Sequence, residues 1–158
     1  MKKLIIPTLL AAAAAWGLYD RFGSSETALS KESAFPSANL TTTRETSASD
    51  ATLSSAYANR TSGIRVQGEG TVSRILPDDD EGSRHQRFLV RLASGQTVLI
   101  AHNIDLAQRV PALESGAKIA FAGEYEWNER GGVIHWTHHD PSGRHPGGWL
   151  RYSGREYR

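Results

Sequence analysis

The chain of 158 residues contains no cysteine and a single methionine. The absence of cysteine excludes disulfide bonds, thiolate-bound zinc and cysteine nucleophiles. An excess of one charge sign is also missing, because 18 Lys and Arg residues stand against 17 Asp and Glu residues. General binding of a polyanion therefore has no support from the charge balance.

Motifs of the common enzyme classes are missing too. The sequence has no G-x-S-x-G nucleophile elbow, no glycine-rich phosphate loop and no H-E-x-x-H metal motif. Function has to be inferred from the segments that are unusual.

The N-terminus is one such segment. Lys2 and Lys3 precede the uncharged run LIIPTLLAAAAAWGLY, residues 4–19. A charged start before an apolar run is typical of an export signal or a membrane anchor. As a helix, the run would reach about 24 Å, short of the roughly 30 Å hydrocarbon core. Residues 1–21 are therefore either a signal peptide cleaved after Ala15 or an anchor in the inner membrane. Both interpretations predict a periplasmic or extracytoplasmic protein.

Residues 22–62 are rich in Ser, Thr and Ala and have few large apolar side chains and no periodicity. Such a segment cannot bury enough apolar surface to offset the entropy lost on ordering. We expect a flexible tether, in which short helical turns near 48–58 are allowed but not required.

The remaining residues, 63–158, predict one small domain that is mainly β. Alternating apolar and polar residues, bounded by Gly, Pro and Asp turns, predict five strands and a final hairpin. These lie at 64–76, 84–93, 96–102, 118–127, 132–139 and 149–158. A short helix is expected at 104–113, with Asn103 as its N-cap. Five strands with a helix between the third and fourth are the order of an OB-type barrel.

Three long strings carry a family resemblance: RHQRFLV (84–90), AHNIDLA (101–107) and GEYEWNERGGVIHWTHHDPSGRHPGGW (123–149). Together they resemble a bacterial family known as domain of unknown function 3465, over essentially all of 64–158. The resemblance implies a small protein that is exported or membrane-tethered. It implies no activity and no cofactor.

The turn of the hairpin at 118–138 predicts which residues of its two strands are paired. With Asn-Glu-Arg-Gly as the loop, Glu124 opposes His135 and Tyr125 opposes Ile134. A carboxylate across from a histidine would raise the histidine pKa or orient its ring. The same register predicts one buried face. Its members are Phe121, Tyr125, Trp127, Ile134 and Trp136.

Four of the six histidines lie within residues 131–145. Neutral imidazoles and a carboxylate are ligands that a divalent metal such as zinc accepts. The candidate metal ligands are His135, His138, His139, Asp140 and His145. Their spacing matches no established zinc signature. A second interpretation stays open, in which hydrogen bonds from these residues pin the loop and no metal binds.

A further group of polar and aromatic residues is a candidate for ligand binding, and His102 belongs to it because the third strand of an OB barrel can lie near the hairpin at 118–138. They are His102, Asn103, Asp105, Glu124, Trp136 and Arg144. For Asn103 and Asp105 the alternative is that they cap the following helix. Residues 64–158 contain 12 basic and 12 acidic residues, so nucleic acid is not an expected partner.

We favour a non-catalytic, exported binding module that recognises an unidentified ligand or envelope protein. One alternative is a metal-dependent hydrolase acting on phosphodiesters, with Glu124 or Asp140 as base. The strings GTVSRIL, DDDEG and LIAHNID are similar to the early strands of thermonuclease-like OB barrels, but no catalytic residue carries over. Two further candidates are a structural envelope protein and a single-stranded nucleic-acid binding protein, which would use Arg144, Arg151 and the aromatic residues near them.

Overall fold

The computed structural model describes residues 49–158 of the chain. The predicted signal or anchor at 1–21 and residues 22–48 of the predicted tether lie outside these residues. A helix over residues 49–58 comes first. Seven strands follow it: β1 (Ile64–Ile75), β2 (His85–Arg91), β3 (Thr97–Asn103), β4 (Lys118–Glu126), β5 (Val133–His135), β6 (Trp149–Tyr152) and β7 (Arg155–Tyr157).

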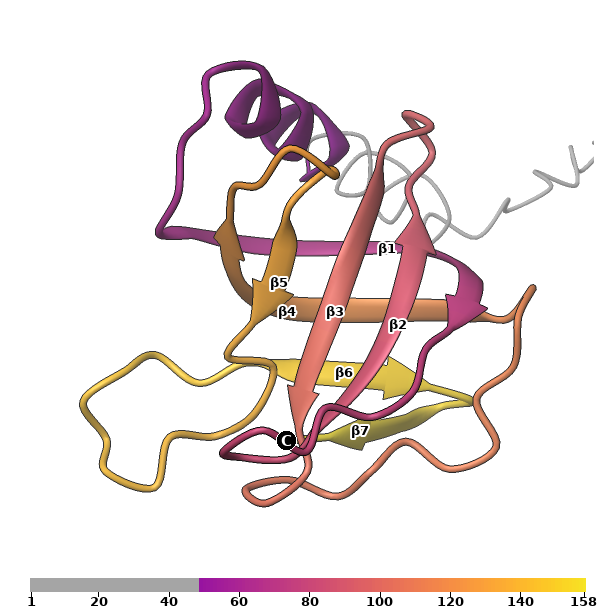
Figure 1. The fold of residues 1–158 in the computed structure, drawn as a ribbon, viewed down its shortest axis with the longest axis vertical. Helices are drawn as coiled ribbons and strands as arrows, with labels where there is room; N and C mark the ends of the chain where they lie inside the picture. The colour runs from indigo at the N-terminus through magenta and orange to yellow at the C-terminus, as the bar shows by residue number, and fades with distance from the viewer. Residues whose placement is uncertain (1–48) are drawn as a thin grey trace, which may run out of the picture. The chain divides into compact units, whose positions relative to one another are not determined.

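Five of the strands close into a barrel (Figure 1). β1 pairs with β2, β2 with β3, β5 with β4, and β4 with β1, all antiparallel. The remaining pair, β3 with β5, is parallel. The β6–β7 hairpin extends the sheet from β4. The predicted fold class is confirmed: the domain is mainly β, with a closed five-strand barrel and one short helix.

The long first strand bends so that it serves both sides of the barrel. β1 pairs with β4 as far as Thr71 and with β2 from Thr71 onward, and its register shifts between Val72 and Arg74. At Gly70 a Cβ atom would press on Val90 and on the carbonyl oxygen of Arg91. Only glycine allows this close approach.

The barrel interior is filled by the apolar side chains that alternate along the strands. The largest fully buried ones are Phe88, Ile100, Ile119, Phe121, Tyr125, Ile134 and Leu150. These side chains face inward from alternate positions of their strands, as the period of two requires. Phe121, Tyr125 and Ile134 thus confirm three members of the predicted buried face.

The helix over residues 49–58 corrects the predicted tether. Leu53 is fully buried and Ala56 is 3% exposed, so one face of the helix belongs to the core. Residues three apart share a helix face, which explains why these two are buried together. Trp127 Nε1 donates to the carbonyl oxygen of Tyr57 at 3.1 Å. Residues 49–62 are therefore part of the folded domain. Between residues 49 and 158, no helix is long and apolar enough to cross a membrane.

The prediction of a helix at 104–113 is wrong. This segment forms turns at 104–106 and 111–112, and in the first of them Asn103 Oδ1 accepts from the backbone N–H of Asp105 and of Leu106. Asn103 thus caps a turn and not the predicted helix, and Pro111 disfavours a helical conformation at Val110. Gln86 instead holds both backbone polar groups of Val110, at 2.9 and 3.0 Å.

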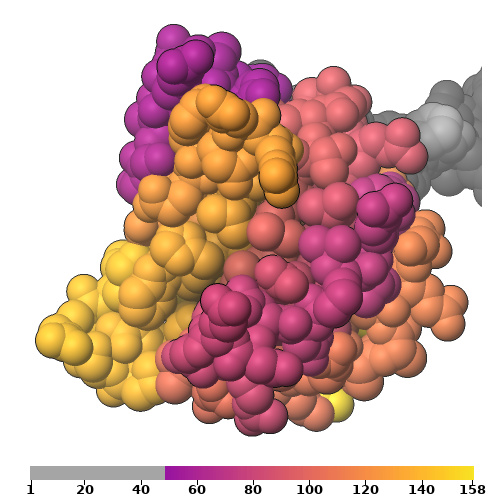
Figure 2. Space-filling model, in the orientation of Figure 1, coloured from indigo at the N-terminus to yellow at the C-terminus, as the bar shows by residue number. Residues whose placement is uncertain are grey.

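A loop over residues 136–148, which we call the His145 loop, leaves the barrel between β5 and β6. Both strands lie along β4, β5 at its end and β6 at Ala120–Ala122. The loop is the gold segment that extends away from the strands in Figure 1 and forms a lobe at the side of the molecule in Figure 2. Gly148 closes its base, because a Cβ there would collide with the carbonyl oxygens of Trp136 and Ala122.

Candidate metal centre

Three side chains on the outer face of the β4–β5 pair form what we call the Glu/His cluster: Glu124, Glu126 and His135. Glu124 is paired with His135 in the register predicted from the sequence. Because Tyr125 and Ile134 point into the core, their strand neighbours must point outward. Glu126 shares the face of Glu124 because it lies two residues further along β4.

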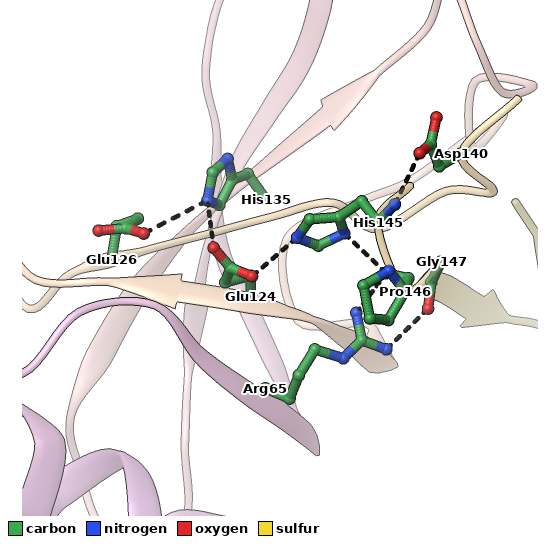
Figure 3. A network of polar contacts seen from close by, with 8 residues as sticks. All are labelled: Arg65, Glu124, Glu126, His135, Asp140, His145, Pro146 and Gly147. Carbon is green, nitrogen blue, oxygen red and sulfur yellow. Dashed lines mark hydrogen bonds and ion pairs between the residues drawn. The ribbon is translucent and has the colours of Figure 1, made fainter. Parts of the chain in front are cut away.

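His135 lies between the two carboxylates (Figure 3). Its Nε2 atom is 4.0 Å from Glu124 Oε1 and 3.9 Å from Glu126 Oε1. Both distances are too long for a hydrogen bond. This nitrogen is buried and has no hydrogen-bond partner within residues 49–158. Each side chain of the Glu/His cluster offers one atom that could bind a metal ion. Within residues 49–158, these three atoms all lie within 4.8 Å of one another.

The surroundings of His135 favour the neutral form of its ring. Burial is the largest influence and lowers its pKa below the ordinary 6.5, although Glu124 and Glu126 act in the opposite direction. The expected rise of the pKa by the carboxylate is therefore outweighed by the loss of water around the ring. A neutral imidazole is the form that a metal ion binds.

His145 contacts the same carboxylate from the other side. Its Nε2 donates to Glu124 Oε2 at 2.8 Å, and its Nδ1 donates to the carbonyl oxygen of Pro146 at 2.8 Å. The ring stacks on Trp136, with ring centroids 3.9 Å apart and planes 10° apart. Glu124 thus stands between two imidazoles, as Figure 3 shows.

Asp140 holds the His145 loop in shape. Its carboxylate accepts from the hydroxyl and N–H of Ser142 and from the N–H groups of Arg144 and His145, at 2.7 to 2.9 Å. The Ser142 hydroxyl, followed by these backbone N–H groups, keeps the pKa of Asp140 far below its usual range. Arg65 holds the far end of the loop, donating to the carbonyl oxygens of Pro146 and Gly147 at 2.8 and 2.7 Å.

The comparison with protein families agrees with the resemblance in the sequence. Residues 37–158 match the model of a family described as protein of unknown function (DUF3465). The chain belongs to the DUF3465 family. No curated protein matches it. The match begins before the predicted boundary at residue 63, which agrees with a helix at 49–58 that belongs to the DUF3465 domain.

The five ligands predicted in the DUF3465 domain do not come together in the described chain. His138 is buried and its Nδ1 donates to the carbonyl oxygen of His139, whose own side chain is exposed. Asp140 is occupied by the loop hydrogen bonds, which also removes it as a candidate general base. The reason is that β5 ends at His135, so the alternation that assigned faces to later residues no longer applies.

Trp136 is not on the buried face. Its φ of 53° lies in the left-handed region, which turns the chain out of the β5 strand. The side chain is half-buried and lies on the polar side, against His145. A bulky residue with positive φ is held there only by its surroundings, here the stack and the closed base of the His145 loop.

The remaining predicted binding residues have structural partners. His102 is fully buried; its Nδ1 accepts from the Thr137 hydroxyl at 2.9 Å and its Nε2 donates to the carbonyl oxygen of Gln108 at 3.2 Å. Burial, the largest influence, lowers the pKa of His102 to about 4. Asp105 accepts from the backbone and side chain of Arg84. The alternative interpretation, in which Asn103 and Asp105 cap a helix, does not hold either, because no helix forms at 104–113: Asn103 caps a turn and Asp105 binds Arg84.

Arg144 and the C-terminal arginines also have partners within the domain. Arg144 Nε donates to the Ser142 hydroxyl at 3.1 Å. Arg151 and Arg158 both pair with Glu156, at 2.8 and 3.1 Å. These contacts neutralise part of the basic and aromatic C-terminal segment.

Two residues of the centre were missed from the sequence. Glu126 had a visible signal, since Glu-x-Glu on a strand places both side chains on one face. Arg65 had none, because it neighbours Glu124 only through the pairing of β1 with β4, which joins residues far apart in the chain.

Proposed function

We propose that the DUF3465 domain is a binding module whose Glu/His cluster takes up a divalent transition-metal ion such as zinc. The observation that carries the proposal is the buried Nε2 atom of His135, which faces two carboxylate oxygens and has no hydrogen-bond partner in the described part of the chain. An unpaired buried polar atom is costly unless a ligand or water satisfies it. One nitrogen and two carboxylate oxygens form a donor set suited to zinc and its neighbours.

The spacing of these atoms supports the proposal. Ligands at about 2.1 Å from a tetrahedral ion lie about 3.4 Å apart. The two separations from His135 Nε2, 4.0 and 3.9 Å, exceed this by about half an ångström. Small rotations of the half-exposed glutamates would close that gap. The partial exposure of all three side chains, 21% to 37%, leaves further coordination positions open to solvent or to a ligand.

Calorimetric titration with zinc tests the proposal. The full chain is purified without a histidine tag, in mild detergent, so that residues 4–19 stay in solution. We expect saturable binding that Glu126→Gln weakens by at least about tenfold, since even groups behind metal ligands are commonly worth 10- to 100-fold. His139→Gln serves as the control because His139 is an exposed histidine of the His145 loop outside the Glu/His cluster. A wild-type titration that equals the buffer blank would refute the metal function.

We also propose that the protein is exported and stays near the inner membrane of a bacterial envelope. The support is the sequence alone, with Lys2 and Lys3 before the apolar run at 4–19. Cell fractionation with intact-mass measurement tests this. Recovery in the cytoplasm would contradict export, while a mass that lacks residues 1–15 would identify a cleaved signal.

A further inference from the structure

We infer that His145 is the fourth ligand of the metal centre and is held ready by the His145 loop. The inference rests on the proposed metal function of the Glu/His cluster. It adds a second imidazole to that cluster. The role of the His145 loop would be to position this imidazole beside Glu124.

The first support is the hydrogen bond at Nδ1. A histidine that binds a metal through one ring nitrogen almost always donates the N–H of the other to a carboxylate or a carbonyl oxygen. His145 Nδ1 donates to the carbonyl oxygen of Pro146 at 2.8 Å, which leaves Nε2 as the coordinating atom. Arg65 contacts the same carbonyl oxygen at 2.8 Å, so the acceptor is itself held in place.

The second support is that Nε2 already faces the cluster. It lies 2.8 Å from Glu124 Oε2, whereas the other oxygen of that carboxylate faces His135. The N–H of His145 donates to Glu124 Oε2. On binding an ion, His145 Nε2 would release its proton to solvent, because only a ring nitrogen without a hydrogen coordinates a metal. The nitrogen and the oxygen would separate from 2.8 Å to about 3.4 Å, the spacing around a tetrahedral ion. The His145 ring would also move closer to His135 and Glu126, because it lies outside the group of atoms within 4.8 Å of one another.

The third support is that the ring is ordered by contacts that do not use Nε2. The stack on Trp136 holds the plane of the ring, and Asp140 accepts the backbone N–H of His145 at 2.8 Å. A ligand fixed in advance loses little conformational freedom on binding. These contacts also explain the strained φ of Trp136, which places its indole beneath the imidazole.

Cobalt(II) provides a direct test because its visible absorption reports ligand number and geometry. Wild-type full chain is compared with His145→Gln, whose amide can still donate to Glu124 but is a poor metal ligand. We expect intense bands of four-coordinate cobalt in the wild type. In His145→Gln we expect weaker bands and an affinity lower by more than about 100-fold, beyond the usual effect of a residue behind the ligands.

His139→Gln is the matched control and should keep the wild-type spectrum and affinity. Circular dichroism melts confirm that each variant is folded. If His145→Gln binds cobalt with the wild-type affinity and spectrum, His145 is not a ligand and this inference fails while the Glu/His cluster stands. If the folded wild type binds no cobalt, the proposed function itself fails.

Discussion

At the scale of single residues, His102 shows how burial decides the state of a side chain. It was a candidate ligand-binding residue, yet both ring nitrogens have protein partners and the ring is fully buried. A carbonyl oxygen can only accept, so Nε2 carries the proton and Nδ1 accepts from Thr137. The neutral ring is therefore part of the core.

His102 predicts a pH dependence of stability. Its pKa is about 4 when folded and near 6.5 when unfolded, so between these values the unfolded chain binds the extra proton. The free energy of unfolding should therefore fall as the pH drops from 6.5 to 4, by up to about 3 kcal/mol from this residue. Urea denaturation at several pH values, compared between wild type and His102→Gln, measures it. Equal slopes for the two proteins would show that His102 is not responsible.

At the scale of elements, the His145 loop shows how one carboxylate organises a connection between two strands. Asp140 accepts from three residues that follow it, so the loop turns back toward β4 within a few positions. The base of the loop is closed by Gly148, whose N–H donates to the carbonyl oxygen of His138 at 2.8 Å. Without these contacts, His145 would not reach Glu124.

We predict that Asp140→Asn loosens this loop and leaves the barrel intact. The amide nitrogen of asparagine donates, so it cannot accept from the N–H groups of Arg144 and His145. Hydrogen exchange should become faster at these two amides and stay unchanged at Phe121 in β4. Ser142→Ala is a graded comparison, because it removes the hydroxyl donor and keeps the acceptor. Unchanged protection at Arg144 and His145 in Asp140→Asn would mean that different contacts hold the loop.

At the scale of the whole molecule, the helix over residues 49–58 moves the boundary of the folded domain toward the N-terminus. It contributes Leu53 and Ala56 to the core and is joined to the barrel by hydrogen bonds at Trp127 and at Ser94, whose N–H donates to Asp50 at 2.8 Å. A domain cut at residue 63 would expose the apolar surface that these side chains cover.

Leu53→Ala should lower the free energy of unfolding by about 2–5 kcal/mol, the usual cost of emptying a buried leucine site. Chemical denaturation measures this, and Ala51→Ser, at an exposed position of the same helix, should have little effect. Limited proteolysis should yield a stable fragment that begins at or before residue 49. A stable fragment that begins near residue 60 would show that the helix is dispensable.

The sequence by itself determined the local elements. Alternating residues identified β2 and β4, and the short turn after Glu126 placed Glu124 opposite His135, because a two-residue period and a tight turn leave one register that buries Tyr125 and Ile134. The barrel class followed from the order of these elements. The pairing of Glu124 with His135 was therefore within reach of sequence reasoning.

Only the tertiary structure decided the rest, because it depends on contacts between residues far apart in the chain. The parallel pairing of β3 with β5 closes the barrel, and the pairing of β1 with β4 brings Arg65 beside Glu124. The alternation of side chains between the two faces of the strand ends at Trp136, where a positive φ ends β5. Beyond that point the positions of His138, Asp140 and His145 follow from a network of loop hydrogen bonds that no sequence period encodes.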